Sequence, residues 1–257
     1  MRKYLIKACL LLGLLTQAEF MFGSAFKVTP VRVTLVPGSA STLLTLTNES
    51  DQTLRFQISA FGWSQAADGT MNLTPTEDIL FFPALLSLNA GEERKVRIAS
   101  KTPAAETEKS YRIFFEELPP LASQASAEGA QVRILTKMGV PVFVAPAKVS
   151  ESGQIDAIRV ENGKLHFAVK NSGNVHFSVQ GVRVRGLGES GSDVFERQLD
   201  GWYVLPGTPR TYEVELPTDV CGKIRSVSIE AQTDMAPNGS SVTGSAAVPP
   251  RSCKSSS

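Results

Sequence analysis

The chain contains few of the residue types that usually carry catalysis or bind metals. Its only two histidines, His166 and His176, lie in the segments KLHFAV and NVHFSV. Side chains alternate between the faces of a strand, so the flanking Leu165, Phe167, Val175 and Phe177 take the apolar face. Both histidines should therefore point toward solvent or a neighbouring loop. Two such histidines without a nearby third ligand are more often structural than a cross-strand metal pair, and we predict no metal site.

Motifs of the common hydrolases and nucleotide-binding enzymes are missing from the sequence. It contains no G-x-S-x-G, no H-E-x-x-H and no phosphate-binding loop. The neighbouring carboxylates Glu116 and Glu117 follow a strand pattern, so they should face opposite sides and cannot serve one active site. The sequence therefore predicts a protein that is not an enzyme and needs no cofactor.

The N-terminal segment has the pattern of a cleavable export signal. Positive charges at Arg2, Lys3 and Lys7 accompany an apolar run over residues 5–15, and the small residues 23–25 precede Phe26. The apolar run is too short for a spanning helix. Cys9 lies inside this run rather than just after it, so a lipid-modified cysteine is not expected. We predict that residues 1–25 are a signal peptide.

Removal of residues 1–25 changes the charge and the cysteine count. The full chain has 26 basic and 25 acidic residues. The segment takes away Arg2, Lys3, Lys7 and Glu19, which leaves 23 basic and 24 acidic groups and a net charge of −1. This near-neutral charge does not indicate a basic surface for binding nucleic acid or a membrane. Cys221 and Cys253 remain, and in an exported chain a disulfide between them is favoured.

Residues 131–146, QVRILTKMGVPVFVAP, form the stretch around which the other elements must be arranged. They alternate with a period of two, which indicates a strand. One face carries Val132, Ile134, Thr136, Met138 and Val140. The other carries Arg133, Leu135, Lys137 and Gly139. A strand with one apolar face and a partly cationic second face needs a partner, either the rest of the chain or another protein.

Short alternating segments separated by turn residues fill the rest of the chain. Before residue 131 they cover residues 26–36, 41–47, 53–63, 78–88, 93–99 and 110–118. After residue 146 they cover residues 155–160, 164–170, 175–184, 194–198, 202–205, 211–216 and 224–231. This spacing predicts an all-β protein of two immunoglobulin-like β-sandwich domains, residues 26–146 and 147–257. The Gly-, Ser- and Pro-rich tail from about Pro237 is expected to be loose apart from Cys253.

The order of several motifs resembles the PapD-like periplasmic chaperones of the chaperone–usher pilus pathway. The motifs are VTPVRVTLVPG (28–38), FGWSQAADG (61–69), FFPALLSLNAGEERKVRIA (81–99), EKSYRIFFEELPP (108–120), VPVFVAP (140–146), NSGNVHF (171–177) and GWYVLPG (201–207). The last two, together with Cys221, look like the family's C-terminal domain and most like its archaic, Csu-like branch.

The resemblance implies a fold and a mechanism. Two immunoglobulin-like domains should meet at an angle, in an L or boomerang shape, with a binding cleft between them. The last strand of the first domain should complete a pilin (fimbrial) subunit that lacks a strand, by donor-strand complementation. Main-chain hydrogen bonds then give affinity, and alternate side chains fill the subunit's groove. The apolar face from Val132 to Val140 would supply these side chains.

The resemblance also implies a cationic anchor and an usher contact. Family members hold the subunit's C-terminal carboxylate with two basic residues in the cleft. Pro141 stands where the classical second cation would be, so we assign the anchor to Arg112 and Lys137, with Arg32 and Arg133 in reserve. The corner Leu118-Pro119-Pro120 would contact the outer-membrane usher, although proline also commonly just ends a strand.

Two further interpretations remain open at this level. The chain could be a secreted immunoglobulin-like adhesin or fibre subunit instead of a chaperone. As a chaperone it would work in the periplasm without membrane insertion. Its exposed edge strand would then need protection between tasks, and pairing with a second copy in a self-capping dimer would provide it.

Overall fold

The computed structural model describes residues 25–121, 134–236, 239–250 and 252–253. Residues 1–24 of the predicted signal peptide, Val132 and Arg133 lie outside these residues. Within it the chain is almost entirely β-structure, as predicted, and the α-helix is the short α2, Thr218–Cys221. No helix in these residues has the length and apolar character needed to cross a membrane.

Strands β1 to β10 form the first sandwich. One sheet has the order β1-β3-β8-β6, and the other has the order β2-β10-β9-β4-β5 with β7 paired to β4. The bounds are β1 Phe26–Thr29, β2 Val33–Leu35, β3 Ser41–Asn48, β4 Leu54–Gln65, β5 Met71–Pro75, β6 Ile79–Phe82, β7 Leu85–Leu88, β8 Glu93–Ser100, β9 Lys109–Leu118 and β10 Lys137–Val144. Alternate residues of both sheets meet in one core, which includes Leu44, Phe56, Phe115 and Val140.

Strands β11 to β18 form the second sandwich. Its sheets have the orders β11-β12-β16 and β14-β13-β17-β18, with β15 paired to β13. The bounds are β11 Gly153–Glu161, β12 Lys164–Asn171, β13 Phe177–Leu187, β14 Asp193–Asp200, β15 Tyr203–Val204, β16 Pro209–Glu215, β17 Ser226–Thr233 and β18 Ser241–Ala247. The apolar neighbours of both histidines are buried in or beside its core.

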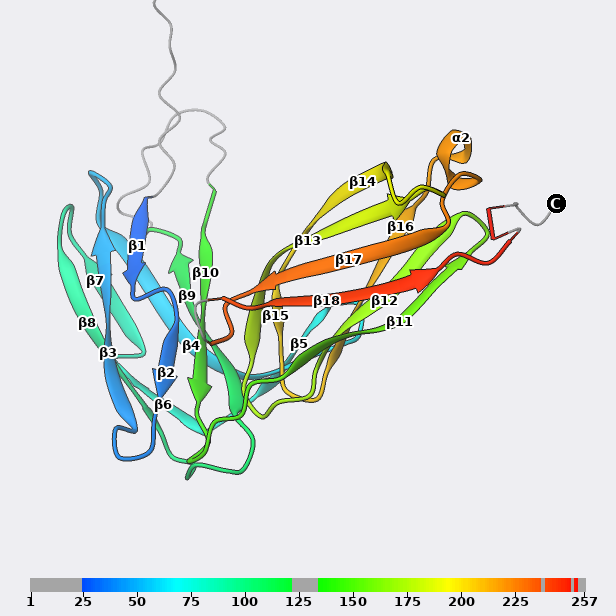
Figure 1. The fold of residues 1–257 in the computed structure, drawn as a ribbon. Helices are drawn as coiled ribbons and strands as arrows, with labels where there is room; N and C mark the ends of the chain where they lie inside the picture. Colours follow the sequence, from blue (N-terminus) through cyan, green and yellow to red (C-terminus); the bar gives the residue numbers. More distant parts are fainter. Residues whose placement is uncertain (1–24, 122–133, 237–238, 251, 254–257) are drawn as a thin grey trace, which may run out of the picture.

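The two sandwiches lie at an angle to each other, with their strands running in different directions (Figure 1). The β4–β5 hairpin of the first sandwich reaches β16 of the second, where the Thr211 amide donates to the Ala67 carbonyl at 2.7 Å. The Gln65 side chain on the same hairpin donates to the Tyr203 carbonyl at 2.9 Å. These two hydrogen bonds join the domains in the predicted L shape.

The C-terminal tail differs from the prediction. Residues from about Pro237 were expected to be loose, but β18 (Ser241–Ala247) pairs with β17 along its whole length. Its small residues allow close packing: a Cβ on Gly244 would lie 2.6 Å from Cβ of Ile155 on β11. The tail is ordered because this narrow strand fits against the neighbouring sheet, a long-range contact that local composition does not show.

The predicted disulfide joins Cys221 in α2 to Cys253 in the tail, across 32 residues of sequence. It closes a loop that contains β17 and β18. We expect the double variant Cys221→Ala/Cys253→Ala to lose about 3 kcal/mol of stability, because an open chain gains entropy when it unfolds. Urea denaturation with and without reductant measures this. A wild-type protein whose unfolding midpoint is unchanged by reductant would contradict the prediction.

Candidate functional site

The edge of β10 is the first unusual feature of the first sandwich. On one side β10 pairs with β9 from Lys137 to Val144. On the other side it pairs with β2 only at Val142–Val144. Within the described residues, the stretch Lys137–Pro141 therefore has one unpaired edge. Its backbone groups face away from the sheet and are available to another strand.

The direction of these groups follows from the ladder. The Glu117 amide donates to the Thr136 carbonyl, and the Ala145 amide donates to the Leu35 carbonyl of the β2 side. Since hydrogen-bonded and non-bonded positions alternate in an antiparallel pair, Lys137 and Gly139 direct their main-chain groups toward the unpaired edge. Pro141, like Lys137 and Gly139, is at a position that points away from β9. Its missing amide proton therefore removes no hydrogen bond between β10 and β9.

The predicted plug face is only partly available. Val140 is fully buried in the first domain's own core, and Met138 packs against that core. The assignment of Val140 to a subunit groove is therefore wrong, because this face of β10 closes the first sandwich. Ile134 and Thr136 precede β10 and are exposed, with Ile134 63% exposed. Val132 lies outside the described residues.

Lys137 is exposed and already paired. Its Nζ lies 2.8 Å from a carboxylate oxygen of Glu116, the residue opposite it on β9. Nζ also lies 5.0 Å from the Phe114 ring centroid. Glu117, by contrast, is buried on the other face, so the two neighbouring carboxylates do face opposite sides as predicted.

Arg112 is the more unusual cation of the site. It is only 7% exposed, and its guanidinium carbon lies 4.3 Å from the Trp63 ring centroid and 5.8 Å from that of Trp202. Nη1 makes a long hydrogen bond of 3.4 Å to the Gly139 carbonyl. In the described part of the chain, the buried Nε and Nη2 have no hydrogen-bond partner. Burial lowers the pKa of Arg112 from its ordinary value.

The geometry of these two N–H groups suits a carboxylate. Nε–H and Nη2–H lie on the same side of the planar guanidinium, and a carboxylate accepts both in parallel. A buried cation that lacks these bonds is costly. The two N–H groups of Arg112 can therefore bind a planar anion with two oxygen atoms, such as a carboxylate.

The two predicted anchor cations lie on the same face of the β10–β9 sheet, but they are not close to each other. Lys137 lies opposite Glu116 and Arg112 lies opposite Pro141, so four ladder positions separate them. At a rise of about 3.3 Å per residue, this places their backbones roughly 13 Å apart. Phe114 lies between them over Gly139, where a Cβ would meet its ring at 2.7 Å. The reserve candidate Arg133 lies outside the described residues.

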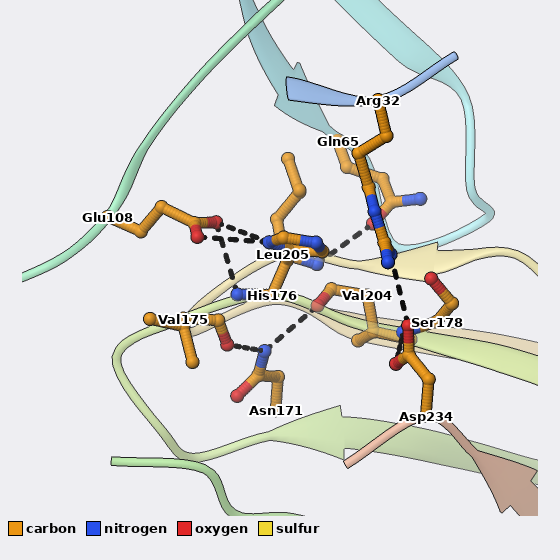
Figure 2. Close-up of polar contacts among 10 residues, drawn as sticks. All are labelled: Arg32, Gln65, Glu108, Asn171, Val175, His176, Ser178, Val204, Leu205 and Asp234. Carbon is orange, nitrogen blue, oxygen red and sulfur yellow. Dashed lines mark hydrogen bonds and ion pairs between the residues drawn. The ribbon is translucent and has the colours of Figure 1, made fainter. Parts of the chain in front are cut away.

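The other reserve cation, Arg32, has a different partner. Its Nη1 lies 3.1 Å from the Asp234 carboxylate in the second domain, and Asp234 also accepts the Ser178 amide at 2.6 Å (Figure 2). Arg32 therefore forms an exposed ion pair between the domains. Its charge is balanced there, which makes it a weaker anchor candidate than Arg112.

His176 and Glu108 form a part-buried contact between the domains that the sequence did not predict. His176 Nδ1 lies 2.8 Å from the Glu108 carboxylate, which also accepts the His176 amide at 3.1 Å (Figure 2). The imidazole stacks on Phe143 of β10, with centroids 3.5 Å apart. His176 thus points toward a neighbouring loop, the one before β9, and its side chain is only 11% exposed. The signal was weak, because Glu108 and His176 are 68 residues apart in sequence.

The asparagines of the NSGNVHF motif hold this contact in place. Buried Asn171 donates to the carbonyls of Val175 and Val204 at 2.8 Å, which fixes the turn before His176 (Figure 2). Asn174 donates to the carbonyls of Glu106 and Lys148 at 2.8 Å. The motif therefore ties the second domain to the loop before β9 and to the connection after β10.

His166 and the proline corner have simpler surroundings. His166 Nδ1 lies 3.7 Å from the Glu213 carboxylate on β16. Among the described residues, no group of three or more His, Cys, Asp or Glu side chains is arranged to hold a metal. Leu118 ends β9, and the Pro119 carbonyl accepts a hydrogen bond from Arg55 at 3.2 Å.

The fold and the site define a class of protein: two immunoglobulin-like sandwiches joined at an angle, with an unpaired strand edge and a buried arginine near their junction. Residues 25–150 match the family model described as "Pili and flagellar-assembly chaperone, PapD N-terminal domain". The first domain of the chain belongs to this family of pilus-assembly chaperones.

Relatives in Escherichia coli carry the name "Probable fimbrial chaperone EcpE". One is 27% identical over 212 residues, which cover 79% of each chain. Another is 27% identical over 164 residues, 62% of this chain and 63% of that relative. The chain thus spans just under two thirds of the length of some of the relatives that it matches.

Solved structures with the same fold include two pilus-system chaperones. The CsuC–CsuE chaperone–tip subunit complex of the archaic Csu pili of Acinetobacter baumannii has a TM-score of 0.59 at 17% identity, covering 86% of this chain and 98% of that one. The class 5 fimbriae chaperone CfaA has a TM-score of 0.55 at 15% identity, covering 88% and 100%. These likenesses extend the two-domain fold to nearly the whole described chain.

Proposed function

We propose that this protein is a non-enzymatic chaperone that captures fimbrial subunits in the periplasm and delivers them to an outer-membrane usher. The unpaired edge of β10, preceded by exposed Ile134 and Thr136, carries the proposal. A subunit that lacks a strand pairs with this edge, while apolar side chains before β10 enter its groove. The similarity to EcpE and to the chaperone in the CsuC–CsuE complex supports this role.

In this proposal the anchor for the subunit's C-terminal carboxylate is centred on Arg112. Its two unpaired N–H groups match a carboxylate, whereas Lys137 is already paired with Glu116. Lys137 contributes through its main chain at the unpaired edge and supports the anchor only through long-range charge. We also propose that the chain belongs to the archaic branch, and the likeness to the Csu chaperone supports this assignment.

The exposed Pro119 at the end of β9 is the proposed contact with the usher, together with Leu118 and Pro120. A second copy of the chain pairing at the β10 edge is the proposed resting state, since an open edge with exposed Ile134 invites strand pairing.

Co-expression with a fimbrial subunit encoded next to this chain tests the proposal. We expect a one-to-one complex. The variant Lys137→Pro should weaken capture by about 5- to 100-fold, because it removes an edge amide and leaves the subunit's acceptor unsatisfied. Affinity is measured with purified subunit in a competition assay.

Lys137→Ala is the matched control, because it removes the same charge but keeps the amide. It should retain most of the affinity. Equal losses in both variants would show that the side chain and not the strand edge binds the subunit. A subunit that folds and assembles normally without this protein would contradict the chaperone role itself.

A further inference from the structure

The N–H groups of Arg112 that are proposed to bind a carboxylate are not accessible from solvent. Nε and Nη2 have no partner and are buried at the same time. The rings of Trp63 and Trp202 both pack near the guanidinium. A carboxylate that binds there must first displace whatever covers these atoms.

The two tryptophans differ in freedom. Trp63, on β4, is buried in a small cluster with Phe143 and Leu205. Trp202 comes from the second domain, in the connection between β14 and β15, and remains 44% exposed. Only the second ring has open space on one side, so it is the one that can turn away without disturbing a core.

The backbone of Trp202 is fixed even though its ring is exposed. Its carbonyl accepts a hydrogen bond from the Val179 amide at 2.9 Å. The preceding residue, Gly201, lies so close to β13 that a Cβ there would be 1.8 Å from the Val179 carbonyl oxygen. The main chain therefore stays in contact with β13, and movement of this residue is limited to side-chain rotation.

We propose that the Trp202 side chain is a movable cover over Arg112, so that the carboxylate site is built from both domains and opens when this ring turns. The inference rests on the proposed function for the identity of the ligand, a chain end with a free carboxylate. With the ring in place, the guanidinium is shielded and its charge is held against indole faces. With the ring turned, the Nε/Nη2 pair is exposed to the ligand.

The cover lowers the apparent affinity, since only the open fraction of molecules can bind. The Trp202 ring also prevents Arg112 from binding other anions. Removal of the ring should therefore improve access and binding. A ring that instead packs on the bound ligand would have the opposite effect, and this difference in sign makes the inference testable.

The first test measures access to Arg112 without any ligand. Phenylglyoxal modifies arginine, and mass spectrometry of the digested protein gives the rate at each site. In Trp202→Ala, modification of Arg112 should be at least about tenfold faster than in the wild type, relative to exposed Arg97. Phe82→Ala, which removes an exposed ring on the other sheet of the first domain, should leave the rate unchanged. An unchanged rate in Trp202→Ala would overturn the inference.

The second test measures binding of a fluorescein-labelled Ala-Ala-Ala peptide by fluorescence polarisation. The peptide with a free C-terminal carboxylate should bind Trp202→Ala about tenfold more tightly than the wild type, and its C-terminal amide should not bind. Equal or weaker binding by the variant, including no binding by either protein, would reject the cover. Because the labelling test reports access alone, failure of subunit capture does not affect it, and the two proposals can fail separately.

Discussion

The variant Arg112→Met is expected to bind a fimbrial subunit at least about thirtyfold more weakly, with no loss of stability in the free protein. Removal of one partner of a buried, hydrogen-bonded charge pair costs about 2–5 kcal/mol in binding. Arg112 is 7% exposed, and its Nε and Nη2 lack partners in the described residues. The subunit's carboxylate would therefore lose both of its charge-assisted hydrogen bonds at once.

The stability of the free variant is the second half of this expectation. A buried cation without a counter-ion is destabilising, and an apolar residue of similar length removes that cost. Loss of the cation–π contact with Trp63 offsets this by about 1–2 kcal/mol. We therefore expect thermal unfolding of Arg112→Met at the same temperature as the wild type, or higher. A substitution that weakens binding without lowering stability is typical of a residue that serves function at a cost in stability.

Lys137→Met is the matched comparison for Arg112→Met. Lys137 and Glu116 form an exposed pair, and such pairs contribute at most about 1 kcal/mol. Capture should fall no more than about fivefold. Titration calorimetry with a purified subunit measures both variants. If Lys137→Met lost as much affinity as Arg112→Met, the anchor would be a true pair of cations and the emphasis on Arg112 would be wrong.

Local patterns in the sequence were enough to predict most strands. The period of two placed the apolar neighbours of His166 and His176 inside the second sandwich, where they are buried. Export left only two cysteines, so the pairing of Cys221 with Cys253 followed from the count. These features depend on neighbouring residues or on elimination, and no knowledge of the tertiary fold was needed.

The alternation around β10 showed two faces but not what covers each of them. Val140 belongs to the face that closes the first sandwich, because β10 is paired with β9 there. Its apolar character equally suits a core and a subunit groove. The two residues differ because β10 begins at Lys137. Ile134 precedes the strand and is exposed, whereas Val140 lies within it and is buried.

The contacts at the domain junction could not be predicted, because their partners are distant in sequence. Arg112 meets Trp63 from its own domain and Trp202 from the other. The sequence indicated a cation on a strand face, and such cations are usually solvated. Arg112 packs against rings that are distant in sequence and come from both domains, and no local pattern encodes such contacts.

The variant Phe143→Ala is expected to cost about 3–5 kcal/mol, the range for removal of a buried aromatic side chain. Phe143 is fully buried at the domain junction. Its ring stacks on His176 and lies 5.9 Å from Trp63 and 5.8 Å from Tyr203, measured between centroids. The lost contacts join the two domains, so the domains should become less tightly coupled.

Differential scanning calorimetry measures this effect. Two domains that share a buried junction unfold together, and weakening the junction should separate the heat absorption of Phe143→Ala into two transitions. The control Phe82→Ala removes a ring that is 77% exposed, and it should change stability by no more than about 0.5 kcal/mol. A single transition in Phe143→Ala at the wild-type temperature would show that the other contacts alone hold the domains.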